Sequence, residues 1–155
     1  MYLYYLLFIT FFFSIQSFGK DHQLMSPDGK TEIIISLNSN LNLQVKFQSN
    51  VIFDAKNIFI ELEDDTKLGV NSVVLNTESV SVDRNINPEI KEKYANIHEL
   101  YNELKLDFSG DYSFVLRAYN DGIAYRFLTR IKNTITIVKE NLDLSFADSD
   151  SIYYQ

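Results

Sequence analysis

Short segments rich in alternating or β-branched apolar residues recur along the chain from residue 31 onward. Segment 41–47 (LNLQVKF) alternates apolar and polar residues without a break, and segment 31–37 (TEIIISL) is rich in β-branched side chains. Both patterns are typical of β-strands that are buried on one face. Further strands are predicted at 51–53, 57–62, 73–82, 100–108, 112–119, 123–128, 134–138, 142–146 and 151–154.

Polar turn sequences separate these segments. Segment 26–30 (SPDGK) combines a proline, which presets φ, with an Asp-Gly corner. Segment 120–122 (NDG) gives the strongest hairpin signal in the chain. Many short strands spaced about 8–12 residues apart by polar turns indicate an all-β fold, an antiparallel β-sandwich.

One segment has a different periodicity. Between Pro88 and Leu104 the apolar residues recur three or four positions apart, at Ile90, Tyr94, Ile97, Tyr101 and Leu104. Taken alone, this period predicts a helix over 89–100 as readily as a strand.

The N-terminus is apolar and uncharged. Thr10 is the one residue of 2–13 that is not apolar. This run is shorter than the ~20 residues that span a bilayer, but it fits the apolar region of a signal peptide. Ser17 and Gly19 supply small residues for cleavage before Lys20. We therefore expect a signal peptide at 1–19 and an exported domain at 20–155, periplasmic or secreted, with no membrane contact after cleavage; a buried strand or an uncleaved anchor is the alternative.

Composition removes most other classes of function. Asp and Glu total 21 against 14 Lys and Arg, a formal net charge of −7. Such a chain has little means of neutralising phosphates, so we expect no nucleic-acid partner. There is no cysteine, and there are two histidines, which excludes disulfides, thiolate chemistry and a histidine-rich metal site.

The densest acidic cluster comprises Glu61, Glu63, Asp64 and Asp65. Its spacing lacks the alternate carboxylates, central glycine and terminal glutamate of a calcium loop. A solvated loop is therefore the favoured interpretation, and no metal site or cofactor is predicted in this chain.

Three motifs together resemble one family. They are 26–30 (SPDGK), 101–104 (YNEL) and 116–127 (LRAYNDGIAYRF), and in this order they look like the N-terminal domain of glycoside hydrolase family 97. The resemblance implies a β-sandwich that precedes a (β/α)₈ barrel in an exported α-glycosidase. It also implies that the barrel carries the catalytic residues, that α-glycosides are the substrates, and that the full-length enzyme binds calcium mainly through barrel glutamates.

The chain also departs from the family pattern. Pro88 is kept, but a tryptophan expected near it is absent, and Lys91 or Glu92 replaces a glycine. The sandwich is shorter than the family's, which implies an incomplete domain without catalytic residues. The resemblance also favours an extended conformation for 89–100. The leading interpretation is an accessory domain that packs on a catalytic barrel; a free-standing carbohydrate-binding module and a non-functional gene fragment are the alternatives.

The candidate binding residues lie in these motifs: Glu103, Arg117, Asp121 and Arg126. A two-residue turn at 121–122 would place Arg117 opposite Arg126, whereas a three-residue loop would place Arg117 opposite Tyr125. The first register is favoured because it gathers apolar side chains on one face. Opposed arginines repel each other, so Glu103 is expected to neutralise them as a counter-ion, in preference to a role at the rim of a sugar site.

Overall fold

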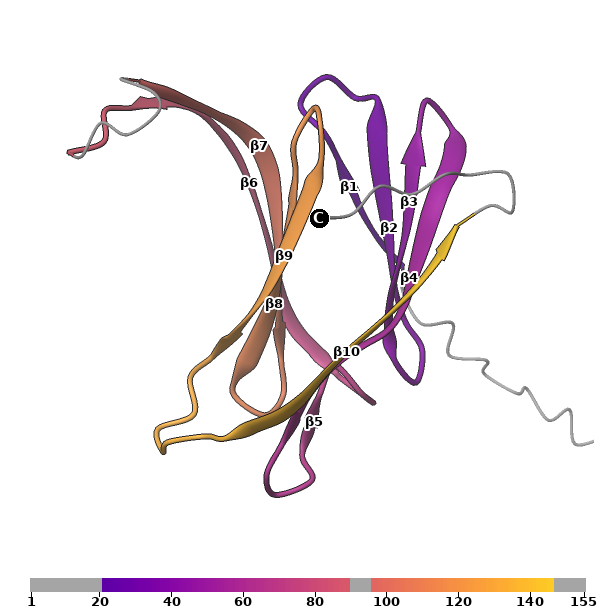
Figure 1. The fold of residues 1–155 in the computed structure, drawn as a ribbon, viewed down its shortest axis with the longest axis vertical. Coiled ribbons are helices and arrows are strands. Elements are labelled where there is room, and N and C mark those ends of the chain that lie inside the picture. The colour runs from indigo at the N-terminus through magenta and orange to yellow at the C-terminus, as the bar shows by residue number, and fades with distance from the viewer. Residues whose placement is uncertain (1–20, 90–95, 147–155) are drawn as a thin grey trace, which may run out of the picture.

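The computed structural model describes residues 21–89 and 96–146, which form two antiparallel sheets packed face to face (Figure 1). The first sheet has the order β1-β2-β3-β4-β10, with β5 also paired to β4, and the second has the order β6-β7-β8-β9. The strands are β1 (His22–Met25), β2 (Thr31–Leu37), β3 (Leu41–Phe47), β4 (Asn50–Leu62), β5 (Lys67–Leu68), β6 (Val74–Ile86), β7 (Ile97–Phe108), β8 (Tyr112–Ala118), β9 (Ile123–Thr129) and β10 (Ile137–Phe146). The predicted antiparallel all-β sandwich is confirmed.

Most predicted strands are present, and two of them, β2 and β3, have the predicted bounds. Strand β4 joins two predicted segments, and so does β10, because bulges interrupt the alternation inside each strand. Strands β1 and β5 are four and two residues long, too short to show a period. The predicted signal peptide and the predicted strand at 151–154 lie outside the described residues.

The helical alternative for 89–100 is wrong where it can be compared with the structure. Residues Ile97–Leu100 belong to β7, and 90–95 lie outside the described residues. Tyr101 and Leu104, which a helix would place on one face, lie on opposite faces of β7, opposite Val82 and Ser79 of β6. Pairing with β6 over twelve residues supplies backbone hydrogen bonds that the local period does not reveal. In the described ranges, no helix is long and apolar enough to cross a membrane.

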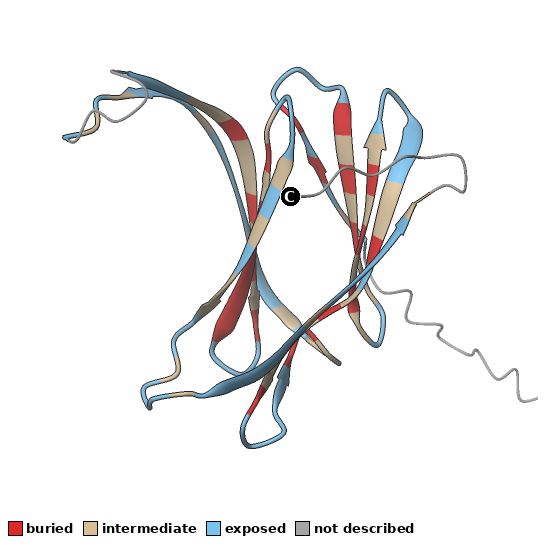
Figure 2. Ribbon diagram, viewed as in Figure 1, coloured by how far each residue is buried: buried red, intermediate tan, exposed pale blue. Residues whose placement is uncertain are grey.

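The core lies between the inner faces of the two sheets, where the buried residues of Figure 2 are concentrated. The first sheet contributes aliphatic side chains, among them Ile33, Ile35, Leu41, Leu43 and Ile58. The second contributes aromatic as well as aliphatic side chains, among them Leu104, Leu106, Phe108, Phe114 and Leu116. Within the second sheet the Phe114 ring stacks on Tyr125, with centroids 5.5 Å apart, and meets the edge of Phe127 at 5.3 Å.

A cluster of amides holds the bulge in β4. Asn57 adopts a positive φ of 54° there, and its backbone N–H donates to Oδ1 of Asn42 at 3.0 Å. Its side chain accepts from Nδ2 of Asn40 at 2.6 Å and donates to the Asp143 carboxylate at 2.8 Å. Asn141 of β10 donates to the Asn57 carbonyl at 2.9 Å. The polar groups released by the bulge are therefore satisfied by β3, β10 and the turn before β3.

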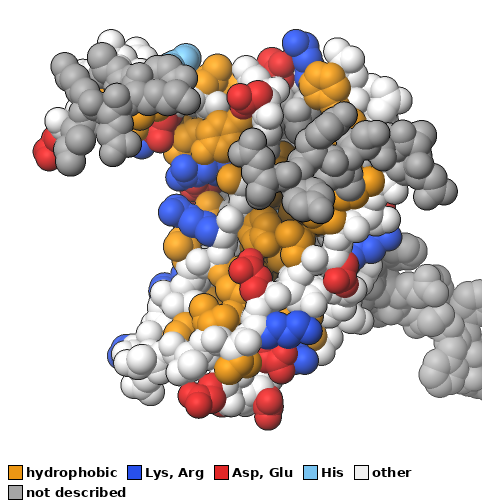
Figure 3. Space-filling view, viewed as in Figure 1, with side chains coloured by type: hydrophobic (Ala, Val, Ile, Leu, Met, Phe, Trp, Pro, Cys, Tyr) orange, Lys and Arg blue, Asp and Glu red, His pale blue; other side chains and the backbone are white. Residues whose placement is uncertain are grey.

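The sandwich is open along the side between β9 and β10. Leu144 pairs with the buried Ala55, so it lies on the inner face of its sheet, yet its side chain is 51% exposed. Leu142 is 40% exposed. Figure 3 shows hydrophobic side chains gathered between the two sheets on this side. The described strands thus leave part of the apolar interior uncovered.

Gly69 allows a close approach of its backbone to that of β4. It has a φ of +105°, and a Cβ there would lie 2.4 Å from the Ile58 carbonyl oxygen. We expect Gly69→Ala to lower the free energy of unfolding by at least about 2 kcal/mol, because backbone strain and a backbone clash add together. Gly122→Ala is the matched control, since its Cβ would meet nothing within 4 Å. Equal urea midpoints for the two variants would contradict this account.

Candidate functional site

The three sequence motifs meet at one end of the sandwich. The backbone N–H of Asp28, in the β1–β2 turn, donates to Oδ1 of Asn120 in the β8–β9 hairpin at 3.0 Å, across 92 residues of sequence. Asn102 of β7 donates through Nδ2 to the Met25 carbonyl at 2.8 Å. Figure 1 shows the β1–β2 turn beside the tip of the β8–β9 hairpin. These contacts tie the two sheets together at that end.

Asp28 is committed to the turn that contains it. Its carboxylate accepts hydrogen bonds from the Ser26 hydroxyl at 2.7 Å and from the Lys30 backbone N–H at 3.1 Å. These bonds, the Ser26 bond first, lower the pKa of the Asp28 carboxyl below its ordinary value. The carboxylate therefore acts as an acceptor that holds the turn and is not arranged as a proton donor.

Glu103 and Arg117 form an ion pair on the outer face of the second sheet. They lie directly opposite each other on β7 and β8, and the Arg117 Nε–H donates to the Glu103 carboxylate at 2.6 Å. The guanidinium group also lies over the Tyr101 ring, 4.3 Å from its centroid. Glu103 foremost, and then Tyr119, raise the pKa of Arg117 above its ordinary value. The predicted contact between Glu103 and an arginine of the hairpin is confirmed.

Both predicted registers of the β8–β9 hairpin are wrong. Arg117 lies opposite Ala124, and Arg126 lies opposite Val115, so the two arginines are diagonal neighbours and not an opposed pair. Gly122 is not among the glycines with a positive φ, and its carbonyl accepts from the Tyr119 N–H at 2.8 Å. Residues 120–121 therefore make the turn. The structure differs from the favoured register by a two-residue shift, which leaves every side chain on the same face, so the apolar face could not distinguish the two registers.

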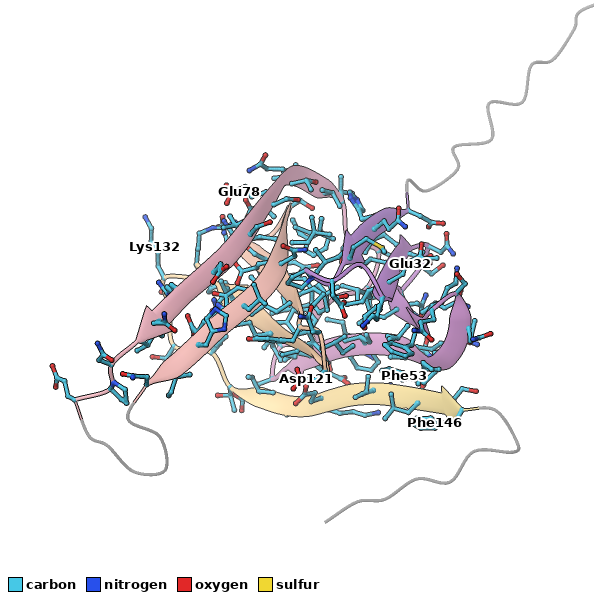
Figure 4. All side chains as sticks on the ribbon, turned by 90° about the horizontal axis from the view of Figure 1, so that it is seen from above. Glu32, Phe53, Glu78, Asp121, Lys132 and Phe146 are labelled. Atoms are coloured by element: carbon cyan, nitrogen blue, oxygen red, sulfur yellow. The ribbon has the colours of Figure 1, made fainter. Side chains whose placement is uncertain are left out.

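The structure brings the two arginines to one notch. Arg117, Arg126 and Tyr119 line a shallow hollow of about 100 Å³ with Val115 and Ala124 between them. Arg126 is exposed and makes no ion pair within the described ranges. Asp121 does not line the notch; it is exposed at the tip of the hairpin (Figure 4). Of the four candidate residues, Glu103 and Arg117 therefore neutralise each other. Arg126 lies beside this pair, and Asp121 lies apart from it.

Asp107 is the centre of a second polar network, which the sequence analysis missed. Its carboxylate accepts from the Ser113 hydroxyl at 2.6 Å and from Arg130 at 3.2 Å, and it pairs with Lys105 at 3.2 Å. Asn76 of β6 donates to the second oxygen at 3.3 Å. These partners, the Ser113 bond first, lower the pKa of Asp107 to about 2. A register for the β7–β8 hairpin, set by its turn at 109–111, would have placed Asp107 opposite Ser113.

The other titratable groups singled out from the sequence lie apart from this site. Residues 63–65 form an exposed turn, and the described ranges contain no group of three or more acidic or histidine residues placed to hold a metal ion. The ring of His98, one of the two histidines of the chain, contacts the Asp83 carboxylate at 2.7 Å through Nε2.

The fold and the junction of the three motifs define an antiparallel β-sandwich in which the carboxylates of Asp28 and Glu103 are bound by N–H groups and a guanidinium group. The profile of the Glycosyl-hydrolase 97 N-terminal family matches residues 24–155. The chain belongs to this family.

Similar proteins are several times longer. A retaining alpha-galactosidase of Bacteroides thetaiotaomicron is 33% identical over 127 residues, which covers 82% of this chain and 19% of that protein. A family 97 enzyme from Pseudoalteromonas sp. strain K8, solved with acarbose, superposes with a TM-score of 0.69 at 19% identity over 82% of this chain and 20% of its own. A beta-arabinopyranosidase superposes with a TM-score of 0.67 at 14% identity, over 78% of this chain and 20% of its own. The chain thus spans about a fifth of each.

The ion pair should contribute modestly to stability. Its side chains are 27% and 20% exposed, between the surface case of about 0–1 kcal/mol and the buried case of about 3–5 kcal/mol. We expect a double-mutant cycle of Glu103→Gln and Arg117→Met to give a coupling of about 1 kcal/mol in urea unfolding. The same cycle with Arg126→Met should give a coupling near zero. A larger coupling to Arg126 would show that the pairing is misassigned.

Asp107 should make stability depend on pH in the acid range. Its folded-state pKa of about 2 lies below the ordinary 3.8, so its stabilisation is present above about pH 4 and is lost as the pH falls through about 2. The free energy of unfolding of wild type minus that of Asp107→Asn should therefore shrink between about pH 5 and about pH 2. Ser113→Ala, which removes the foremost donor, should show a weaker pH dependence than wild type. A difference that stays constant with pH would contradict the assignment.

Proposed function

We propose that this chain is the accessory N-terminal sandwich of an exported α-glycosidase whose catalytic groups lie in a barrel domain outside it. The observation that carries the proposal is the family match over residues 24–155 together with coverage of only about a fifth of each longer relative. Export rests on the apolar run at 2–13, which fits a signal peptide.

The open side of the sandwich supports an accessory role. Leu142 and Leu144 of β10 are exposed beside the uncovered interior, and Ile137 and Val138 at the start of the strand are more than half exposed. Exposed apolar surface of this kind marks a site of association with other protein. We assign this side to contact with the remainder of the enzyme.

We assign contact with a carbohydrate to the two exposed candidate residues, Arg126 and Asp121. Glu103 and Arg117 neutralise each other, so their hydrogen-bonding capacity is largely used. Arg126 retains all its N–H donors in the described part of the structure, and Asp121 is exposed; both have groups that suit sugar hydroxyls. The calcium expected for the full-length family does not fit the described residues, which offer no cluster of ligands, and its ligands are assigned to the barrel.

A free-standing carbohydrate-binding module has less support. Such modules present flat aromatic rings to sugars, whereas most aromatic side chains here face the core or are half-buried. Phe47, which is 39% exposed, is the most exposed aromatic residue in the described ranges.

An accessory domain should have no activity alone but should support activity in trans or in a chimera. We expect the purified chain to hydrolyse neither aryl α-glucosides nor aryl α-galactosides. A chimera in which residues 24–155 replace the aligned segment of the Bacteroides enzyme should hydrolyse an aryl α-galactoside faster than that enzyme with the segment deleted. The same chimera carrying Gly69→Ala is the fold-disrupted control. Hydrolysis by the chain alone, or a chimera no better than the deletion, would overturn the proposal.

A further inference from the structure

The four edge strands of the two sheets differ in length and regularity. The edge strands are β1 and β10 in the first sheet and β6 and β9 in the second. Strand β1 has four residues and β9 has seven, and β10 is interrupted by two irregularities in its pairing with β4. Strand β6 has thirteen residues and pairs with β7 without interruption from Asn76 to Ile86. It is the long, regular edge of the described structure; Figure 2 colours most of it as exposed, and Figure 4 shows it as the outermost strand of its sheet, with Glu78 labelled on it.

Strand β6 lacks several of the devices that block pairing at an edge, and its charged residues are Glu78, Asp83 and Arg84. Its sequence, VLNTESVSVDRNI, contains no proline, lysine or glycine, and no bulge follows Asn76. A regular edge of this length is a template for another strand whose charges are complementary to its own. Val80, on the outer face of this strand, is 54% exposed, so the edge also offers apolar surface to an incoming strand.

Backbone geometry restricts how β6 could pair with itself. In an antiparallel sheet, alternate residues direct their N–H and C=O groups to one neighbouring strand and the remaining residues direct theirs to the other. Two copies of β6 can therefore bond only when facing residues belong to the same alternate set. A two-fold axis must then pass through a residue and not between two residues. The register is set by which residue lies on the axis.

Charge selects one of these registers. With Ser81 on the axis, Glu78 lies opposite Arg84 of the second copy and Val80 opposite Val82 of the second copy, with no like charges opposed. With Val80 on the axis, Glu78 would face a valine, and with Val82 on the axis it would face an isoleucine. Opposed charges and opposed β-branched side chains are both favourable cross-strand pairs. The Ser81-centred register thus places Glu78 opposite Arg84 and Val80 opposite Val82 on both sides of the axis.

We propose that a second copy of this chain docks on β6, antiparallel and centred on Ser81, so that two four-stranded sheets become one continuous sheet. The intramolecular partners leave the charged groups available. Arg84 uses Nε to bind Glu99 at 2.7 Å, and Glu78 reaches Lys105 at 3.4 Å. Both Arg84 and Glu78 side chains are more than half exposed, and the guanidinium group has further N–H donors for a second carboxylate.

A charge exchange distinguishes this pairing from a fold effect. Analytical ultracentrifugation of the full 155-residue chain should show a monomer–dimer equilibrium. Arg84→Glu alone and Glu78→Arg alone should each raise the dimer dissociation constant about tenfold, because each opposes like charges twice across the axis. The double variant should return it to within about threefold of wild type. Within one chain the double variant has the least favourable charge pairs, because the new arginine faces Lys105 and the new glutamate faces Glu99. Recovery of the dimer affinity in the double variant is therefore explained only by pairing between copies. Association through the apolar N-terminus would not respond to these changes.

Disulfide trapping gives a second measurement that leaves the charges intact. The chain has no cysteine, so Ser81→Cys introduces a single thiol on the axis, and oxidation should yield a covalent dimer. Ser145→Cys, an exposed serine on β10, is the matched control and should stay monomeric. A chain that remains monomeric at millimolar concentration, or a dimer trapped through Ser145 in place of Ser81, overturns the proposal. Pairing of β6 with a strand of another protein, with no dimer formed, also overturns it.

Discussion

Strand β8 is an interior strand of the second sheet, and its side chains are buried on both of its faces. Phe114 and Leu116 on the inner face are fully buried against the first sheet, while Ser113 and Val115 on the outer face are buried as well. A strand buried in this way must have all its polar atoms satisfied. The Ser113 hydroxyl meets this requirement by bonding Asp107 and Arg130, and the polar network on the outer face follows from that need.

Local pattern predicted those parts of the fold in which one face is buried and the chain is regular. The sequence of β3 alternates without a break and that of β2 is rich in β-branched residues, and the ends of both strands agree with the structure. β4 was divided in two because Asn57 shifts the alternation by one residue, and a bulge of this kind depends on partners in other strands. The helical stripe at 89–100 was misleading because long pairing with β6 overrides local period.

The candidate site could be predicted as a set of residues but not as an arrangement. The contact of Glu103 with an arginine was foreseen, although the reason given, two opposed arginines, was wrong. The apolar face of the hairpin is identical in registers two residues apart, so composition could not decide between them. The bond between Asp28 and Asn120 joins residues too distant in sequence for any local pattern to indicate. The family's signature residues in this chain largely hold the sheets together, and they leave Arg126 as the group free to face outward.

The bulge in β4 and the outer face of the second sheet hold their strands by different chemistry. Around Asn57 four of the five groups involved are amides, which keep their hydrogen bonds across the whole range of pH and salt. The second sheet relies in part on the carboxylate of Asp107, whose pKa is lowered to about 2 and which is protonated only in strong acid. The two networks therefore differ in their response to acid: protonation of Asp107 weakens the bonds that join β6, β7 and β8, whereas the bonds among the asparagines around Asn57 contain no ionisable group.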